Sequence, residues 1–87
     1  MPTVFACHDV NDTAHWLSSP KREEFFTPYG VTNIRTFVDP RNPTRVGVLF
    51  DVPDLDTFEA AMQTEGAAEA MAHDGVRPET LVVLVES

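Results

Sequence analysis

The middle of the chain carries the pattern of a β-hairpin, which limits the fold to those that contain an antiparallel strand pair. Residues 31–38 alternate between two faces, and residues 45–52, RVGVLFDV, are rich in the β-branched and aromatic residues that favour strands. The sequence between them, DPRNPT, contains the Asp, Asn and Pro typical of turns. The two segments are expected to pair, with Arg35 and Asp51 in contact across the hairpin.

One strand and one helical segment precede the hairpin. Residues 3–9 favour a strand, and the polar residues 9–13 can cap the helix that follows them. Pro20 interrupts this helix because proline lacks the amide hydrogen that a helix interior needs. Proline suits the first position of a helix, so a second helical piece is expected to start there and to end before Gly30.

A second helix and a last strand follow the hairpin. Asp54 or Asp56 can cap this helix, Gly66 is expected to dent it, and Gly75 fits its C-terminal end. Residues 79–86, ETLVVLVE, then form a short apolar strand.

The predicted order of elements is therefore β-α-β-β-α-β over one domain, residues 1–87. This order is that of the ferredoxin-like α+β fold, a four-stranded antiparallel sheet with two helices on one face. A chain of 87 residues buries only a modest fraction of its surface, so its core is marginal unless a partner extends it.

Two helices cover only one face of such a sheet, and the other face should be polar in a monomer. Three of the four strands are instead apolar on both faces, as shown by Val4 and Ala6 against Phe5 and Cys7 in the first strand. An exposed apolar face is an association surface, so we expect a homodimer through the open sheet face. The alternative is a monomer with one apolar face.

The charge of the chain excludes two classes of partner. It has 6 Lys and Arg against 14 Asp and Glu, a formal net charge of -8, and no basic run. Binding to phosphate backbones or anionic membranes depends on clustered basic residues, so neither nucleic acid nor a membrane is an expected partner. The N-terminal sequence lacks signal-peptide features and the single Cys7 cannot form an internal disulfide, so a cytoplasmic location is expected.

The stretch FACHDVNDTAHW, which begins at Phe5, holds two of the three histidines and the only tryptophan. His8 ends the first strand on the face of Val4 and Ala6, and it is the candidate for proton transfer, because histidine titrates near neutral pH. The alternative role for His8 is that of a partly exposed histidine at a strand end. An enclosed cavity of about 300 Å³ or more, lined by His8 or His15, would favour a small-molecule site.

Aromatic and polar side chains of the first helical segment are candidates for contact with a ligand. We expect His15, Trp16, Phe26 and Tyr29 to shape a pocket between the sheet and this segment. Aromatic residues at helical spacing also form ordinary cores, which is the alternative.

A metal site is not expected. Cys7 and His8 are adjacent on a strand and point to opposite faces, so they cannot readily converge with His15 on one ion. Cys7 has no basic neighbour in sequence to activate it, which favours a structural thiol. We therefore expect neither a metal nor a cofactor.

The chain resembles the dimeric α+β barrel superfamily of ferredoxin-like proteins. The resemblance is carried by residues 45–62, RVGVLFDVPDLDTFEAAM, by the preceding hairpin FVDPRNPTR, and by an amphipathic first helix that contains Trp16. The superfamily includes cofactor-independent quinone-forming monooxygenases, polyketide cyclases, muconolactone isomerases, haem-degrading enzymes and proteins without an assigned activity. It implies a homodimer with a pocket between each sheet and its own helices.

The resemblance does not select a reaction, because one fold hosts many functions. Haem-degrading members use a histidine of the second helix as iron ligand, but His73 lies almost at the C-terminus of that helix, where histidine is common for dipole reasons. The first hypothesis is a protein that binds a small apolar or aromatic molecule, with monooxygenase, cyclase or isomerase activity as an alternative. A non-catalytic interaction module is the competing hypothesis.

Overall fold

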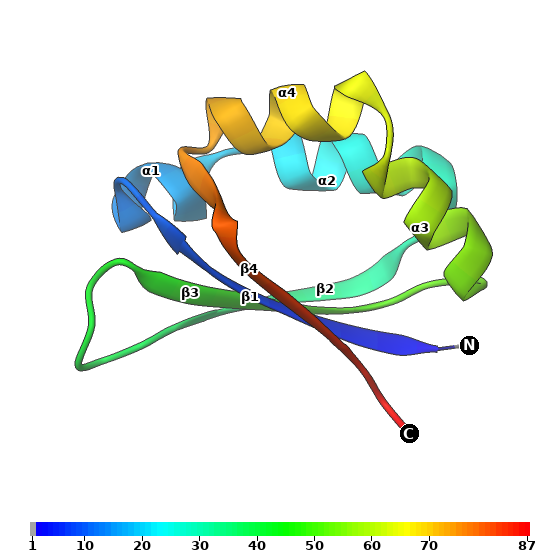
Figure 1. Ribbon diagram of the computed structural model, residues 1–87, viewed down its shortest axis with the longest axis horizontal. Helices are drawn as coiled ribbons and strands as arrows, with labels where there is room; N and C mark the ends of the chain where they lie inside the picture. The colour runs from blue at the N-terminus through cyan, green and yellow to red at the C-terminus, as the bar shows by residue number, and fades with distance from the viewer. Residues whose placement is uncertain (1) are drawn as a thin grey trace.

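The computed structural model describes residues 2–87 and contains one four-stranded sheet with its helices on one side (Figure 1). The predicted βαββαβ order is confirmed, with each helical segment divided into shorter pieces. The elements are β1 (Thr3–Val10), α1 (Thr13–Ser18), α2 (Lys21–Phe26), the 3-10 turn η1 (Thr27–Tyr29), β2 (Thr32–Val38), β3 (Arg45–Asp51), α3 (Leu55–Met62), α4 (Glu65–His73) and β4 (Val76–Val85).

The sheet has the strand order β2-β3-β1-β4, and all neighbouring strands are antiparallel. The hairpin strands β2 and β3 are adjacent, as expected, and β1 lies at the centre between β3 and β4. Helices α2 and α4 lie side by side over the sheet, with α1 and α3 toward its two ends (Figure 1). The molecule therefore has two layers, and one face of the sheet has no helices over it.

Side-chain caps determine where the helices begin. The Asp12 carboxylate accepts the amide hydrogen of His15 and starts α1, and Pro20 separates α1 from α2, as predicted. The second helical segment breaks at Gln63, before Thr64, whose hydroxyl caps α4. The expected dent at Gly66 is thus two residues too late, because a capping threonine, and not a flexible glycine, separates α3 from α4.

Two strand irregularities differ from the sequence prediction. The strand β4 begins at Val76 and not at Glu79, with a register shift opposite β1 where Thr80 Oγ1 accepts the Asp9 amide hydrogen. In β2 the backbone of Asn33 has a φ of 54°, and the pairing with β3 shifts there.

The shift in β2 changes the partners of Asp51. Its carboxylate accepts hydrogen bonds from Thr3 Oγ1 at 2.6 Å and from Asn33 Nδ2 at 2.8 Å, while Arg35 lies opposite Leu49. The expected contact of Arg35 with Asp51 is therefore wrong, because a bulge cannot be seen in an alternating pattern. The bonds from Asn33 and Thr3 lower the pKa of Asp51.

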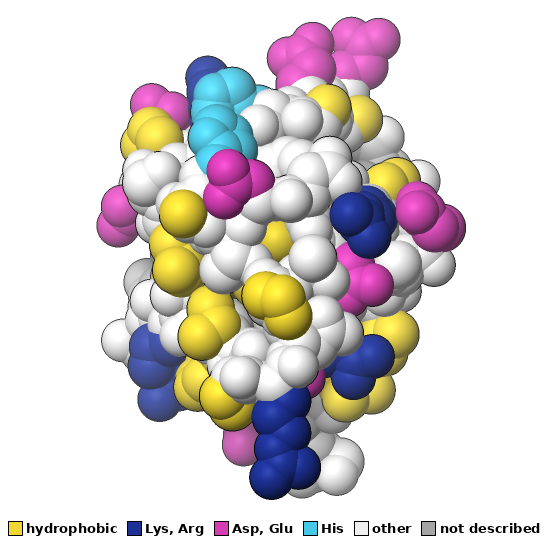
Figure 2. All heavy atoms as spheres, turned by 90° about the vertical axis from the view of Figure 1, so that its left-hand side faces the viewer, with side chains coloured by type: hydrophobic (Ala, Val, Ile, Leu, Met, Phe, Trp, Pro, Cys, Tyr) yellow, Lys and Arg dark blue, Asp and Glu magenta, His cyan; other side chains and the backbone are white. Residues whose placement is uncertain are grey.

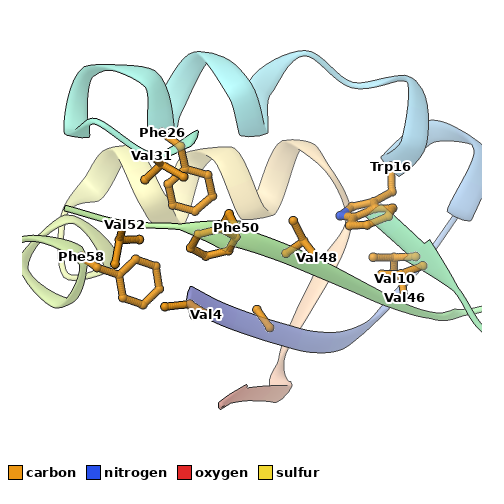
Figure 3. Close-up of a cluster of buried hydrophobic side chains, with 11 residues drawn as sticks. Val4, Val10, Trp16, Phe26, Val31, Val46, Val48, Phe50, Val52 and Phe58 are labelled. Atoms are coloured by element: carbon orange, nitrogen blue, oxygen red, sulfur yellow. The ribbon is translucent and has the colours of Figure 1, made fainter. Parts of the chain in front are cut away.

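The core lies between the sheet and the helices. Every second residue of β1 and β3 is buried in it, which confirms the predicted assignment of Val4 and Ala6 to one face. Trp16 packs near Val10 and Val46 at one end, and a cluster of phenylalanines lies at the other, with Val48 between them (Figure 3). The phenylalanines are Phe26, Phe50 and Phe58, whose ring centroids lie 4.9–6.4 Å apart.

The other side of the sheet, called the open face below, is also apolar. Cross-strand pairs place its side chains on one surface. Its apolar residues are Phe5, Cys7, Phe37, Leu49, Val82 and Leu84, and Arg35, beside Leu49, lies on the same face. Leu84 is 58% exposed in the single chain and Phe37 is 46% exposed.

The open face has one close packing contact of its own. Gly47 leaves room there for the ring of Phe5, because a Cβ at this position would lie 2.7 Å from the ring. Among residues 2–87, no helix combines the length and the apolar character that crossing a bilayer requires.

Candidate functional site

A small cavity lies between the sheet and the helices α2 and α4. Its volume is about 70 Å³, and most of its wall is apolar. One end of the wall is polar, where side chains from β1, α2 and the end of α4 meet. The apolar wall is made by Ala6, Trp16, Phe25, Phe26, Val48, Phe50, Phe58, Met62, Ala67, Ala70, Met71, Val76, Leu81 and Val83, and the polar end by His8, Arg22 and Asp74.

His8 is the buried polar residue of β1. The strand alternation directs it to the same side as Val4 and Ala6, so only 7% of its surface is exposed. Its Nδ1 atom is buried and has no hydrogen-bond partner. The ring packs edge-on against Trp16, with 5.7 Å between the centroids. A buried polar atom without a partner is costly, so this nitrogen is a position where a ligand group would be favourable.

The surroundings of His8 favour its neutral form. Burial lowers the pKa of His8 below its ordinary value of 6.5, and the Arg22 cation acts in the same direction. The backbone of Asp9 acts against this shift, and so do the Asp9 and Asp74 carboxylates, but burial is the largest cause. At neutral pH the ring is therefore an imidazole that can accept a proton.

Arg22 provides a cation at the same end of the cavity. Its guanidinium carbon lies 4.3 Å from the centroid of the Trp16 ring, and Nη1 donates to the Trp16 carbonyl oxygen at 3.5 Å. Burial lowers the pKa of Arg22, while the Asp74 carboxylate opposes that effect. A guanidinium has five N–H donors, so one hydrogen bond leaves others for an anionic group.

Asp74 joins the end of α4 to the cavity. It is the C-cap residue of α4 and only 4% exposed. Its Oδ1 accepts hydrogen bonds from the Ser19 hydroxyl, in the link between α1 and α2, and from His73 Nδ1 at 3.0 Å. A carboxylate here faces the negative end of the helix dipole, which is unfavourable by itself. The nearby Arg22 offsets this cost.

The structure brings only some of the predicted site residues together. His8, Trp16 and Phe26 line the cavity. His15 is exposed on α1, where its Nε2 donates to the His73 carbonyl oxygen at 2.7 Å, and Tyr29 packs on Phe25 outside the lining. The structure therefore matches neither expectation fully. His8 faces a cavity, as a small-molecule site requires, but this cavity is smaller than expected, and His15 is exposed to solvent.

Arg22 and Asp74 are the site residues that sequence reasoning missed. Arg22 comes from the helical piece after Pro20, and the sequence does not show that this piece crosses the cavity end. Asp74 could have been noticed in the sequence, because an acidic residue at the C-terminal end of a helix is unfavourable unless another part of the protein provides a partner for it.

The Cys7 side chain lies on the open face and is partly buried, while its neighbour His8 points to the other face of the sheet. This placement agrees with the expectation that Cys7 and His8 do not converge on one site. The cavity wall does not include the thiol.

Comparison with known proteins identifies the fold. The sequence matches no protein-family model and no curated protein. Three similar solved structures are an antibiotic biosynthesis monooxygenase (17% identity, TM-score 0.65, 100% of this chain and 97% of that one), a candidate antibiotic biosynthesis monooxygenase from Bordetella bronchiseptica (16%, 0.76, 99% and 94%), and SnoaB, a cofactor-independent oxygenase from Streptomyces nogalater (15%, 0.68, 98% and 87%). Identities this low show the fold alone. The chain therefore has a ferredoxin-like α+β fold, which it shares with these structures.

Proposed function

We propose that the protein binds a small, largely apolar molecule, most simply an aromatic one, between its sheet and helices, and that His8 accepts a proton from it. The observation that carries this proposal is the buried Nδ1 of His8, which has no partner and lies at the wall of an apolar cavity. An acidic O–H or C–H group of a ligand would meet a neutral base in surroundings that exclude water.

Arg22 supports the second half of this step. Loss of a proton leaves an anion on the ligand, and the half-buried cation of Arg22 near His8 would stabilise that anion. The stacked Trp16 ring holds the guanidinium in place. Proton acceptor and anion stabiliser are thus two different side chains at one end of the cavity.

The reaction that we test first is oxygenation without a cofactor, because one structural neighbour is a cofactor-independent oxygenase. A carbanion formed at a ring CH₂ group can be oxidised by dioxygen to a carbonyl. One oxygen atom stays in the product and the other leaves as water together with both hydrogens of the CH₂ group. Cyclase and isomerase reactions also begin with removal of such a proton, so they remain alternative outcomes.

The size of the cavity limits the ligand. An apolar cavity of about 150 Å³ holds benzene, so even one ring needs more room than the about 70 Å³ present between sheet and helices. Met62 and Met71 are unbranched side chains of the wall and can turn to enlarge it. We therefore expect ligand binding to be accompanied by movement of α4.

The experiment compares wild type with His8→Gln, Arg22→Met and the control Cys7→Ser. Thermal unfolding with a panel of phenols, naphthols and anthrone measures binding, and an oxygen electrode measures turnover. We expect His8→Gln to bind a ligand but to lose turnover by about 10²-fold or more. Arg22→Met should lose both in part, and Cys7→Ser should retain both.

A different result would favour the non-catalytic interaction module. If no probe raises the unfolding temperature of the wild type and none causes oxygen uptake, the cavity is a packing defect of the core. The small volume of the cavity is the observation that favours this second function.

We also propose that the protein is a cytoplasmic homodimer that pairs through the open face. The exposed Phe37, Val82 and Leu84 support this arrangement, because their contact with a second copy would remove apolar surface from water. Sedimentation equilibrium should show a dimer at micromolar concentration, and Leu84→Asp should shift it to monomer. A wild type that sediments only as a monomer would contradict the pairing.

A further inference from the structure

A second cluster of chemistry-bearing side chains, which shares Asp74 with the cavity wall, lies where α1 meets the end of α4. His15, His73 and Asp74 each offer one nitrogen or oxygen atom, and these atoms lie within 4.8 Å of one another. The two imidazole rings face each other with 5.3 Å between centroids. Figure 2 shows histidine side chains gathered at the surface of the molecule.

His73 lies 58 positions after His15 in the sequence, so the fold creates this cluster. The hydrogen bond from His15 Nε2 to the His73 carbonyl oxygen, 2.7 Å long, holds α1 against α4. The bond between His73 Nδ1 and Asp74 Oδ1, 3.0 Å long, and the bond from the Ser19 hydroxyl to Asp74 fix the carboxylate. One ligand atom of the three is thus held rigidly in a buried position, and the other two belong to exposed rings.

We propose that His15, His73 and Asp74 bind a divalent transition-metal ion, for which Zn²⁺ fits best. Imidazole nitrogen and carboxylate oxygen are zinc ligands, and water can occupy a fourth position. Two nitrogens of a tetrahedral zinc ion lie about 3.3 Å apart, so the rings must approach by no more than about 1.5 Å from the separation in the structure. Both rings are exposed, and the change requires that the metal replace the hydrogen bonds of His15 Nε2 and His73 Nδ1.

The charges at this point favour a cation. The carboxyl end of α4 carries the negative end of the helix dipole, and the Asp74 carboxylate adds a full negative charge. A zinc ion coordinated by His73 Nδ1 and Asp74 Oδ1 would take the place of the proton that now joins these atoms. The exposed position of both rings leaves an entry path for the ion.

The site would connect the surface to the cavity through Asp74, which contributes to both. An ion there would draw the Asp74 charge away from Arg22 and would fasten α1 to α4 at the polar end of the cavity. This proposal is independent of the proposed proton transfer, because zinc binding can be measured without any substrate.

The test is calorimetric titration of untagged protein with Zn²⁺, with Co²⁺ as a spectroscopic probe of tetrahedral coordination. We expect one ion per chain and a rise in unfolding temperature with zinc concentration. His15→Gln and His73→Gln should each weaken zinc binding by about tenfold or more, and the control Cys7→Ser should bind as the wild type does. Nuclear magnetic resonance of the histidine rings should show shifts for His15 and His73 on zinc addition.

The proposal is overturned if the wild type binds zinc more weakly than about 1 mM, or if the double variant His15→Gln and His73→Gln binds as tightly as the wild type. Both replaced side chains are exposed, so the variants are expected to fold, and circular dichroism checks this. Equal stoichiometry in Cys7→Ser and the wild type excludes binding through the thiol.

Discussion

The two faces of the sheet both carry apolar residues, but these residues are buried to different extents. On β3, Phe50 faces the helices and is 1% exposed, while its neighbour Leu49 faces the open side and is only partly buried. On β1, Val4 is fully buried and Phe5 is not. An alternating apolar pattern therefore indicates which side chains are stabilised by burial, but it does not indicate which part of the protein covers them.

The faces also differ in where they place a polar group. The helix-covered face contains His8, whose buried nitrogen lacks a partner, whereas the open face has no comparable group among residues 2–87. A buried polar atom is costly on the covered face because water cannot reach it. The difference locates candidate chemistry on the covered face and candidate association on the open one.

The largest expected difference between the faces is in stability. Phe50→Ala should lower the free energy of unfolding by about 3–5 kcal/mol, because it removes a fully buried ring and leaves a cavity. Leu49→Ala should cost about 1 kcal/mol in the isolated chain, since part of that side chain remains in water. Urea unfolding at low protein concentration measures both.

Protein concentration provides the control for this pair. If the open face pairs with a second copy, the cost of Leu49→Ala should grow with protein concentration while that of Phe50→Ala changes little. Equal costs at every concentration would mean that the two faces are equally buried and that the comparison is wrong.

The next effect concerns pH and His8. Burial lowers the pKa of His8 in the folded state, so between that value and 6.5 the unfolded chain binds more protons than the folded one. Above pH 6.5, His8 should therefore not lower the free energy of unfolding. Below pH 6.5 the free energy of unfolding should fall with the pH, by at most about 1.4 kcal/mol per pH unit from this one group.

The variant His8→Gln should remove this part of the pH dependence, and unfolding in urea between pH 4.5 and 7.5, a range of about three units around the histidine value, measures it. His15→Gln is the matched control, because the His15 side chain is exposed. If the unfolding free energy of His8→Gln depends on pH as that of the wild type does, then the burial of His8 in its neutral form does not lower stability in acid.

The smallest expected effect tests packing on the open face. A Cβ at Gly47 would lie 2.7 Å from Cζ of Phe5, so Gly47→Ala must displace that ring. Because the ring is partly exposed and can turn outward, we expect a loss of about 1 kcal/mol, at the low end for overpacking. The double variant Phe5→Leu with Gly47→Ala should recover most of this loss, and a double-mutant cycle measures the recovery.

Much of the fold could be predicted because it depends on local patterns. The hairpin turn, the break at Pro20 and the cap at Asp54 each follow from the chemistry of a few neighbouring residues. The bulge at Asn33 and the early start of β4 could not be predicted, because they depend on how two strands fit each other. An alternating pattern carries no record of a register shift.

The candidate site was predictable for His8, whose strand determined its face, and for the helical aromatic residues Trp16 and Phe26. His8 shares the parity of Val4 and Ala6, so the sequence placed it on their face of the sheet, and the structure shows that the helices cover this face. Arg22 and Asp74 reach the same point from other elements, at distances in the sequence that no local pattern connects.

The sequence by itself determined the order of strands and helices, the caps and turns between them, and the two apolar faces of the sheet, since these follow from the side chains of adjacent residues. Only the tertiary structure decided that His8, Arg22 and Asp74 meet at one end of a small cavity and that His15 meets His73. The physical reason is that side chains from separate elements come together through the packing of α2 and α4 on the sheet, which depends on contacts along the whole chain.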